Sequence, residues 1–187
     1  MRALRIGLVA LLLCAPARAA ETPLLDAVLA GFGRVRHVEA RYVERRFLAV
    51  LRAPLETRGT LRFDAPDRLE KTGDPETGER IVVAGGAMTV ERGPGVPPLK
   101  LALREHPEIG ALVESVRAML AGDAVSLRRD FDVDVAGDVA HWQIVLRPHR
   151  DDLVRWVRLD GEAARITRIE TREADGDRSE MTIEPAR

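Results

Sequence analysis

The chain has 187 residues, of which 45% are hydrophobic and only 4% aromatic, and its 29 basic and 30 acidic residues nearly balance. This length fits one domain that buries roughly two thirds of the surface that its unfolded chain exposes. The balanced charge argues against a basic nucleic-acid-binding face, and the scarcity of aromatic rings argues against a stacking platform for sugars or single-stranded nucleic acid. We therefore expect no nucleic-acid partner.

The first nineteen residues have the features of a secretory signal peptide. Arg2 and Arg5 precede an apolar run over residues 6–15, and Ala-Arg-Ala at residues 17–19 forms a small-x-small cleavage site. The run is about half of the ~20 residues that a membrane-spanning helix needs. We expect cleavage after residue 19 and a mature, exported domain over residues 20–187, with the net charge changed from −1 to −4 by loss of the leader's three arginines.

Cys14 lies within this leader, so the mature chain is expected to have no disulfide and no thiol chemistry. The alternative is a lipoprotein in which Cys14 becomes the acylated first residue. That processing needs a small residue where the bulky Leu13 stands, which favours simple cleavage.

A helix is the first predicted element after the leader. Thr22 and Pro23 form an N-cap followed by proline, and the apolar residues at positions 24, 25, 28, 29 and 32 fall on one helical stripe. Gly31 and Gly33 end the pattern. The stripe predicts an amphipathic helix that packs against the rest of the domain.

Strands follow from His37 onward, because the hydrophobic pattern changes to a period of two. In residues 55–64, for example, Leu61 and Phe63 point to one face and charged residues to the other. The pair Gly85-Gly86 is a two-residue hairpin signal. The strands predicted in this half of the chain cover residues 38–43, 55–64, 68–71, 79–84, 87–91 and 99–103.

A second helix is predicted after Pro107, with apolar residues at positions 109, 112, 113, 116 and 120 and Gly122 as its stop. Strands then resume and continue to the end of the chain, with Asp160-Gly161 and Asp175-Gly176 as turns. These later strands are predicted at residues 131–135, 141–147, 153–159 and 165–173, and around residues 181–183.

Together these elements predict a mainly β fold. Roughly ten strands joined by short connections can pair only antiparallel, because a parallel crossover needs a dozen or more residues. Each strand has one charged and one aliphatic face, so the sheet must cover its apolar face by curling or with the two helices. Because two helices are too few to cover the whole sheet, we expect an apolar concave surface that suits a flexible acyl chain.

The sequence offers no constellation for catalysis or metal binding. Asp130, Asp132 and Asp134 have the opening spacing of a calcium loop, but Val135 stands where that loop needs glycine, so a strand face explains them better. The four histidines lack zinc-ligand spacing, and no serine lies in a Gly-x-Ser-x-Gly elbow. We expect a protein that is not an enzyme and that uses no cofactor and no metal.

Two stretches of the chain carry a family resemblance. Residues 47–71 read F-L-A-V-L-R-A-P-L-E-T-R-G-T-L-R-F-D-A-P-D-R-L-E-K, and residues 78–90 read G-E-R-I-V-V-A-G-G-A-M-T-V. The clearest motif is Gly59-x-Leu61-x-Phe63-x-x-Pro66. With the leader and the N-terminal helix, these stretches resemble the LolA family of periplasmic outer-membrane lipoprotein carriers, especially its LolA-related branch.

The resemblance implies an open, strongly curved antiparallel sheet, an unclosed β-barrel, with helices covering its mouth and a hydrophobic cavity inside. It also implies a monomeric carrier or chaperone for a lipoprotein or other lipid-like cargo. Such a carrier passes its cargo from an inner-membrane donor complex to an outer-membrane acceptor without a cofactor. The residues expected to line the lipid-binding cavity are Tyr42, Phe47, Leu48, Leu55, Leu61, Phe63, Leu69, Ile81, Val83, Met88, Val90, Leu112 and Val116.

The chain departs from the typical carriers at one point. They place an arginine before the proline of the motif and an aromatic residue soon after it, whereas this chain has Ala65 and the stretch Leu69-Glu70-Lys71. In the typical carriers that arginine helps to hold the lid closed. Its absence means that the resemblance does not extend to the lid mechanism or to a triacylated lipoprotein cargo. A glycolipid or another lipid-like molecule is the alternative cargo. A second hypothesis is a binding or sensor module of the same fold that does not move lipid.

Residues 47–51 form an apolar run where a hairpin connection should be polar. One interpretation is a hydrophobic lip at the cavity rim that touches cargo or a membrane-bound partner. The other is that alternate members pack in the core while the strand bulges past Arg52 and Pro54.

Overall fold

The structure is a computed structural model that describes residues 21–75, 78–149 and 154–186, without the side chains of residues 21, 22, 107–109, 111 and 112. The predicted signal peptide lies outside these ranges. The described residues form eleven strands, three α-helices and one 3-10 helix. In chain order the elements are α1 (Glu21–Phe32), β1 (His37–Phe47), β2 (Leu55–Asp64), β3 (Arg68–Gly73), β4 (Glu79–Ala84), β5 (Ala87–Arg92), β6 (Leu99–Ala102), η2 (Leu103–Glu105), α2 (Pro107–Ala121), α3 (Ala124–Asp130), β7 (Phe131–Gly137), β8 (Trp142–Pro148), β9 (Val154–Glu162), β10 (Arg165–Glu173) and β11 (Arg178–Pro185).

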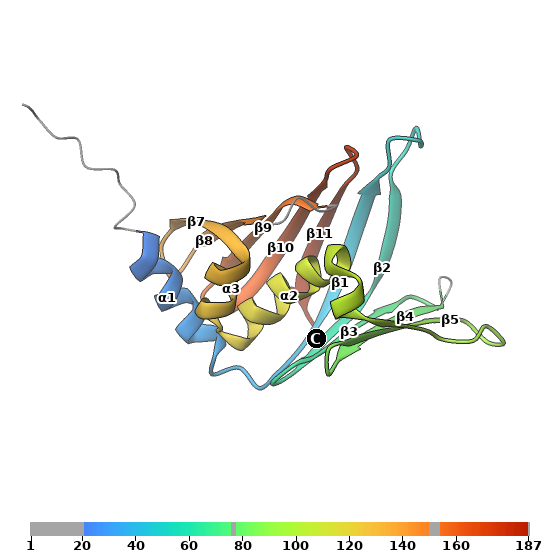
Figure 1. Ribbon diagram of the computed structural model, residues 1–187, viewed down its shortest axis with the longest axis horizontal. Helices are drawn as coiled ribbons and strands as arrows, with labels where there is room; N and C mark the ends of the chain where they lie inside the picture. The colour runs from blue at the N-terminus through green and yellow to red at the C-terminus, as the bar shows by residue number, and fades with distance from the viewer. Residues whose placement is uncertain (1–20, 76–77, 150–153, 187) are drawn as a thin grey trace, which may run out of the picture.

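All strands belong to one antiparallel sheet with the order β6-β5-β4-β3-β2-β1-β11-β10-β9-β8-β7. Two meanders, β1 to β6 and β7 to β11, are joined where the first strand pairs with the last, so that Ala40 lies between Leu61 and Pro185. β6 and β7 are the two free edges, and the sheet curls without closing (Figure 1). The predicted mainly β, unclosed and curved antiparallel architecture is confirmed.

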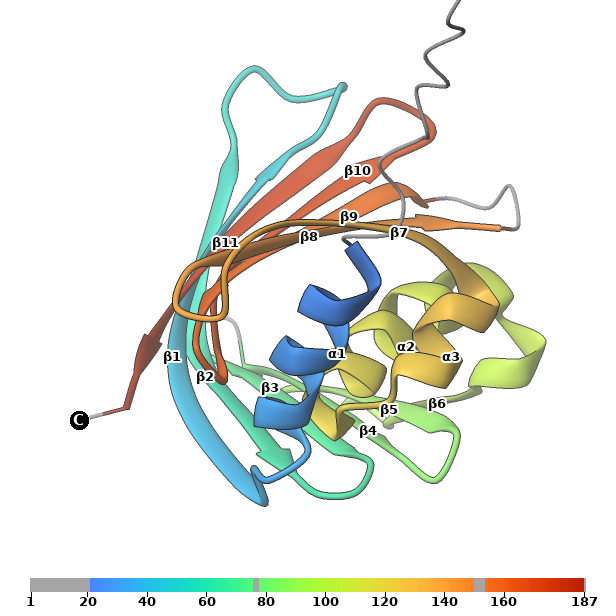
Figure 2. The same cartoon turned by 90° about the vertical axis from the view of Figure 1, so that its left-hand side faces the viewer.

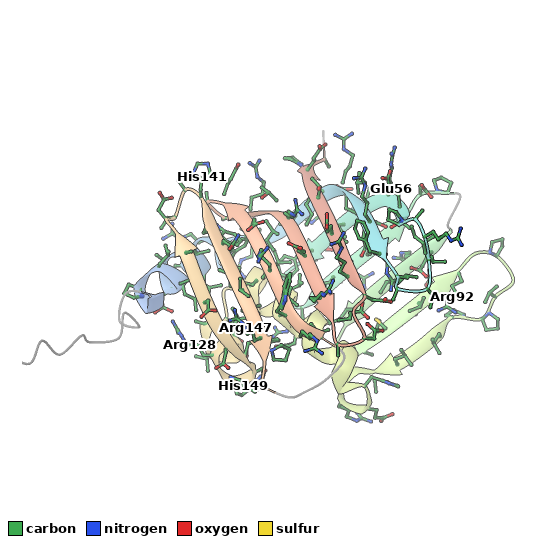
Figure 3. The ribbon with its side chains drawn as sticks, turned by 90° about the horizontal axis from the view of Figure 1, so that it is seen from above. Glu56, Arg92, Arg128, His141, Arg147 and His149 are labelled. Atoms are coloured by element: carbon green, nitrogen blue, oxygen red, sulfur yellow. The ribbon has the colours of Figure 1, made fainter. Side chains whose placement is uncertain are left out.

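The helices lie inside the curl of the sheet. Figure 2 shows β7 to β9 above α1, α2 and α3, and β3 to β6 below them. The outer face carries charged side chains, such as Arg147 of β8, which is paired with Asp134 of β7 (Figure 3). Because side chains alternate along a strand, a wetted outer face leaves the aliphatic side chains to the concave face.

The helices pack mainly against one half of the curl. The main buried cluster joins Phe32 of α1, Met119 of α2 and Leu127 of α3 to strand residues such as Ile144 and Leu159. Among the described residues, all strand members of this cluster come from β7 to β10. Phe63 and Val83 of the N-terminal meander are buried outside it. The C-terminal meander therefore carries the packed core, and the N-terminal meander faces a less filled space.

Several predicted turn signals are confirmed. Gly85 and Gly86 join β4 to β5 with φ angles of 57° and 73°, which only glycine adopts readily. Gly122 ends α2 in the left-handed conformation with a φ of 70°. The turn at Asp175-Gly176 lies between β10 and β11, as predicted.

The predicted turn at Asp160-Gly161 is wrong. β9 continues through both residues to Glu162, and the chain turns at Ala163, whose φ is 50°. Gly161 lies inside the strand, directly beneath the ring of Trp142. A larger residue does not fit here, because an added Cβ would lie 2.1 Å from Trp142 Cζ2. The glycine thus serves close packing instead of a turn.

The prediction that strands resume directly after α2 is also wrong, because the short helix α3 intervenes. Asp123 caps this helix by accepting a hydrogen bond from the Ser126 backbone N–H at 3.0 Å. One turn later, the side chain of Leu127 is fully buried in the main cluster. α3 therefore closes the packed half of the interior next to β7.

Candidate functional site

A cavity of about 520 Å³ lies between the concave face of the N-terminal meander and α2. Its walls come from β1 to β4, from β10 and β11, and from the helices α1 and α2. Most of the lining side chains are apolar, and they include Val38, Ala40, Leu61, Phe63, Leu69, Ile81, Val83, Val113, Val116, Leu120, Ile166, Ile169, Met181 and Ile183. The titratable lining residues are His37, Glu39, Arg62, Glu70, Lys71 and Arg165.

The strand register builds one wall of this cavity from two rows of side chains. Residues that pair directly across neighbouring strands lie on the same face of a sheet. The first row, from β1 to β4, consists of Val38, Phe63, Leu69 and Val83. The second row, two residues further along each strand, consists of Ala40, Leu61, Lys71 and Ile81.

The opposite wall comes from α2 and the C-terminal strands. Val113, Val116 and Leu120 of α2 recur at helical spacing, so one stripe of the helix faces the cavity. Another face of the same helix is anchored in the packed core, where Ala118 and Met119 are fully buried. α2 thus covers the cavity with one part and holds to the core with another.

One end of the cavity carries a charged pair. Lys71, which lines the cavity, donates a hydrogen bond from Nζ to the carboxylate of Glu44. The ammonium also lies 4.9 Å from the centre of the Tyr42 ring. Burial, and then the negative charge of Glu44, raise the pKa of Tyr42 to about 12, so its phenol stays protonated at neutral pH. Most of the cavity wall is therefore apolar, and this end carries a partly buried charged pair.

Six of the thirteen residues predicted to line a lipid-binding cavity do line this one. They are Leu61, Phe63, Leu69, Ile81, Val83 and Val116. Tyr42 is buried just beyond the lining, beside Lys71. Met88 and Val90 of β5 pair with Val83 and Ile81 but lie outside the lining. The side chain of Leu112 is outside the described part of the chain.

The remaining three predicted residues lie at the end of the β1–β2 hairpin, away from the cavity lining. Phe47 is half-buried under the guanidinium of Arg178, 3.8 Å from its ring centre, and Leu48 is half-buried as well. Leu55 is exposed, and Val50 at the tip is 89% exposed. This hairpin projects beyond the neighbouring strands (Figure 1), so residues 47–51 form a partly exposed tip instead of a cavity wall.

Sequence reasoning missed the contribution of α1 and the last strands to the cavity. Phe32 at the end of α1 lines it, as do Ile169, Met181 and Ile183 of β10 and β11. The alternating pattern of these strands was recognised, but a local pattern does not show that the last strand pairs with the first. A cavity wall from the C-terminus was therefore not expected.

Three carboxylates cluster at the turn between β10 and β11. Oxygen atoms of Glu173, Asp175 and Asp177 lie within 4.8 Å of one another, and burial together with Asp175 raises the pKa of Glu173. Asp177 accepts a hydrogen bond from the Ala49 backbone N–H at 2.7 Å. The turn thus ties the two neighbouring hairpins together.

Each helix in the described ranges is too short or too polar to cross a lipid bilayer.

The sequence matches the protein-family model described as "Outer membrane lipoprotein carrier protein LolA-like" over residues 15–186. No curated protein sequence matches the chain. Two solved structures are similar in fold. The LolA superfamily protein NE2245 from Nitrosomonas europaea has 13% identity and a TM-score of 0.46, with 88% of this chain and 94% of that chain covered.

The second is a domain from Vibrio parahaemolyticus described as an outer membrane lipoprotein-sorting protein domain, with 7% identity, a TM-score of 0.48, and 87% and 91% of the two chains covered. Because both TM-scores are low, the family assignment rests on the sequence match. That match extends over nearly the whole described chain. The chain therefore belongs to the family of outer membrane lipoprotein carrier protein LolA-like proteins.

Proposed function

We propose that this protein is a periplasmic carrier that shelters the acyl chains of a lipoprotein or another lipid-like cargo and passes it from the inner membrane toward the outer membrane. The observation that carries the proposal is the aliphatic cavity of about 520 Å³. Its volume falls within the roughly 300–1,000 Å³ typical of small-molecule sites. Membership of the LolA-like family supports the same function.

An aliphatic lining suits an acyl chain because such a chain needs contact and exclusion of water but few hydrogen bonds. Each methylene group moved out of water contributes about 0.8 kcal/mol. Non-covalent binding of this kind is reversible, which a carrier requires. Cargo then moves toward whichever site binds the lipid more tightly, without a covalent step.

The uneven packing of the interior supports entry of a ligand. The helices are anchored through residues such as Met119 in the packed half, whereas Val113 and Val116 of α2 are half-buried above the cavity. Rearrangement of these half-buried side chains would widen the cavity while Met119 keeps its place in the main buried cluster. Stability and ligand access therefore depend on different faces of the same helix.

The binding step can be tested with delipidated protein and a fluorescent fatty acid. We expect saturable binding with one site per chain. Leu61→Asp should weaken it at least tenfold, because it places a charge in the aliphatic wall. Thr60→Asp is the matched control, since this neighbour lies exposed on the other face of β2 and should leave binding unchanged. A folded wild-type sample without saturable uptake would contradict the proposal.

The transfer step separates a carrier from the alternative, a binding or sensor module. A carrier should speed the exchange of labelled lipid between two vesicle populations in proportion to its concentration. A sensor module should bind the same lipid without accelerating exchange. Lipid binding without faster exchange would therefore contradict the carrier proposal and favour the sensor module.

A further inference from the structure

Lys71 is the one lysine in the cavity wall, and it stands in an otherwise aliphatic row. Its direct neighbours across the sheet are Leu61 on β2 and Ile81 on β4, and Ala40 follows on β1. A lysine at such a position points to the same concave face as these aliphatic side chains. The chain has only one other lysine, Lys100, which is exposed on β6.

The position of Lys71 marks one end of the cavity along the N-terminal strands. Its row is the last that lines the cavity there, because the next row, Tyr42, Gly59 and Gly73, lies outside the lining. In the opposite direction the lining continues past the row of Leu69 to Phe32 and Ile166. Lys71 therefore marks one end of the cavity, and the other end is lined by Phe32 and Ile166 together with His37 and Arg165.

The contacts of Lys71 leave part of its hydrogen-bonding capacity unused. Within the described residues, the structure gives its ammonium one hydrogen-bond partner, the Glu44 carboxylate. The side chain of Lys71 is 27% exposed and that of Glu44 only 10%. An ammonium carries three donors, so two N–H groups remain for an acceptor that enters the cavity.

Stability does not explain why this pair stands in the wall. Removing two charges from water costs several kcal/mol for each ion, and well-packed apolar residues are often equally stabilising or better. The neighbours of Lys71 in its row show that aliphatic side chains fit this wall. Apolar ligand sites, in contrast, commonly contain a few placed polar groups that set the orientation of the ligand.

We infer that Lys71 binds an anionic oxygen of the ligand's head group, a carboxylate or a phosphate, while the acyl chain extends toward Phe32 and Ile166. Glu44 and the Tyr42 ring hold the ammonium in position before the ligand arrives. This inference rests on the proposed function and narrows its cargo to amphiphiles with an acidic group next to the chain. A neutral ester of the same chain lacks the charge that strengthens such a hydrogen bond.

The test compares a fluorescent fatty acid with its methyl ester, which has the same chain, and with a lysophosphatidic acid of that chain. We expect the wild-type protein to bind at least one of the two acids at least tenfold more tightly than the ester. Whichever acid binds more tightly shows whether Lys71 prefers a carboxylate or a phosphate. Lys71→Met should lower acid binding at least tenfold and leave ester binding unchanged. Lys100→Met is the matched control and should change neither.

Two further measurements guard against misfolding of the variant. The double variant Lys71→Met/Glu44→Gln removes the carboxylate that would otherwise stay buried and unpaired, and it should show the same loss of acid binding. In wild-type protein labelled with ¹³C-lysine, saturation with the acid should shift the Lys71 signal and leave the Lys100 signal in place.

Equal binding of acids and ester, or an unmoved Lys71 signal at saturation, would overturn this inference and leave the carrier proposal standing. Absence of binding by all three probes would instead overturn the carrier proposal and this inference with it.

Discussion

The ring of Phe32 at the end of α1 meets the ring of Trp142 on β8 edge to face, with their centroids 5.8 Å apart and their planes at 76°. The indole N–H of Trp142 donates to the Ala163 carbonyl oxygen at 2.9 Å, which fixes the ring. Phe32 belongs to the main buried cluster and also lines the cavity. This contact therefore joins the packed half of the interior to its hollow half.

Replacement of Phe32 by alanine should lower the free energy of unfolding by about 3–5 kcal/mol, because a large buried ring is lost and Trp142 loses its partner. Urea denaturation followed by tryptophan fluorescence measures this. Phe47→Ala is the comparison, since Phe47 is only half-buried beneath Arg178 and its loss should cost less than about 2 kcal/mol. Equal costs at the two sites would show that Phe32 does not anchor the core.

Two glycines should respond to alanine substitution with opposite signs. At Gly161 an added Cβ would lie 2.1 Å from the Trp142 ring and 2.4 Å from the Arg165 carbonyl oxygen, so Gly161→Ala should destabilise by roughly 1–3 kcal/mol. At Gly31, within α1, the nearest atom would be the Ala164 Cβ at 3.4 Å. Gly31→Ala should therefore stabilise by roughly 0.5–1 kcal/mol. Thermal unfolding of both variants gives the two signs directly.

The fold was largely predictable because its local pattern is strong. In β2 the inward Leu61 and Phe63 alternate with outward polar residues, and the structure keeps this alternation. The pairing of β1 with β11 was not predictable, since Ala40 and Pro185 are far apart in the sequence. α3 was missed because it is only 7 residues long and because Leu127 is its only buried large apolar residue, while Val125 is exposed, so it has no apolar stripe.

The cavity lining was predictable only in part, for a different physical reason. Val90 has the same inward position as its cross-strand neighbour Ile81, yet only Ile81 lines the cavity. The position of α2, which depends on its buried end at Met119, decides which inward residues face the cavity. An alternating pattern identifies the face of a residue but not the element that covers it.

The start of α3 should contribute a measurable dependence of stability on pH. Hydrogen bonds from the Ser126 hydroxyl at 2.6 Å and from its backbone N–H at 3.0 Å lower the pKa of Asp123 below 3.8. Since the pKa in the folded state lies below that of the unfolded chain, this carboxylate stabilises the fold above its unfolded pKa. The stabilisation is lost as the pH falls through the folded pKa.

Asp123→Ala should therefore cost about 0.5–2 kcal/mol at neutral pH. Asp123→Asn should retain most of the cap but weaken the loss of stability between neutral and acidic pH. Urea denaturation at neutral and at acidic pH, with the wild type alongside, measures the difference. An unchanged acid response in Asp123→Asn would show that this carboxylate does not contribute to it.

The tip of the β1–β2 hairpin should matter for transfer and not for folding. Val50 is 89% exposed and Leu51 44% exposed, and within the described ranges Arg52 beside them forms no ion pair. Apolar side chains next to an arginine favour contact with a membrane that contains anionic lipids. We therefore expect Val50→Asp/Leu51→Asp to leave the melting temperature and fatty-acid binding unchanged and to slow exchange between anionic vesicles severalfold.

Val139→Asp provides the matched control for this variant, because Val139 is an exposed valine in the connection between β7 and β8, on another part of the surface. It should leave the exchange rate unchanged. If the hairpin variant exchanged lipid at the wild-type rate, the tip would have no part in membrane contact. If the hairpin variant instead unfolded at a lower temperature, the apolar run would contribute to packing, and the second interpretation of residues 47–51 would be favoured.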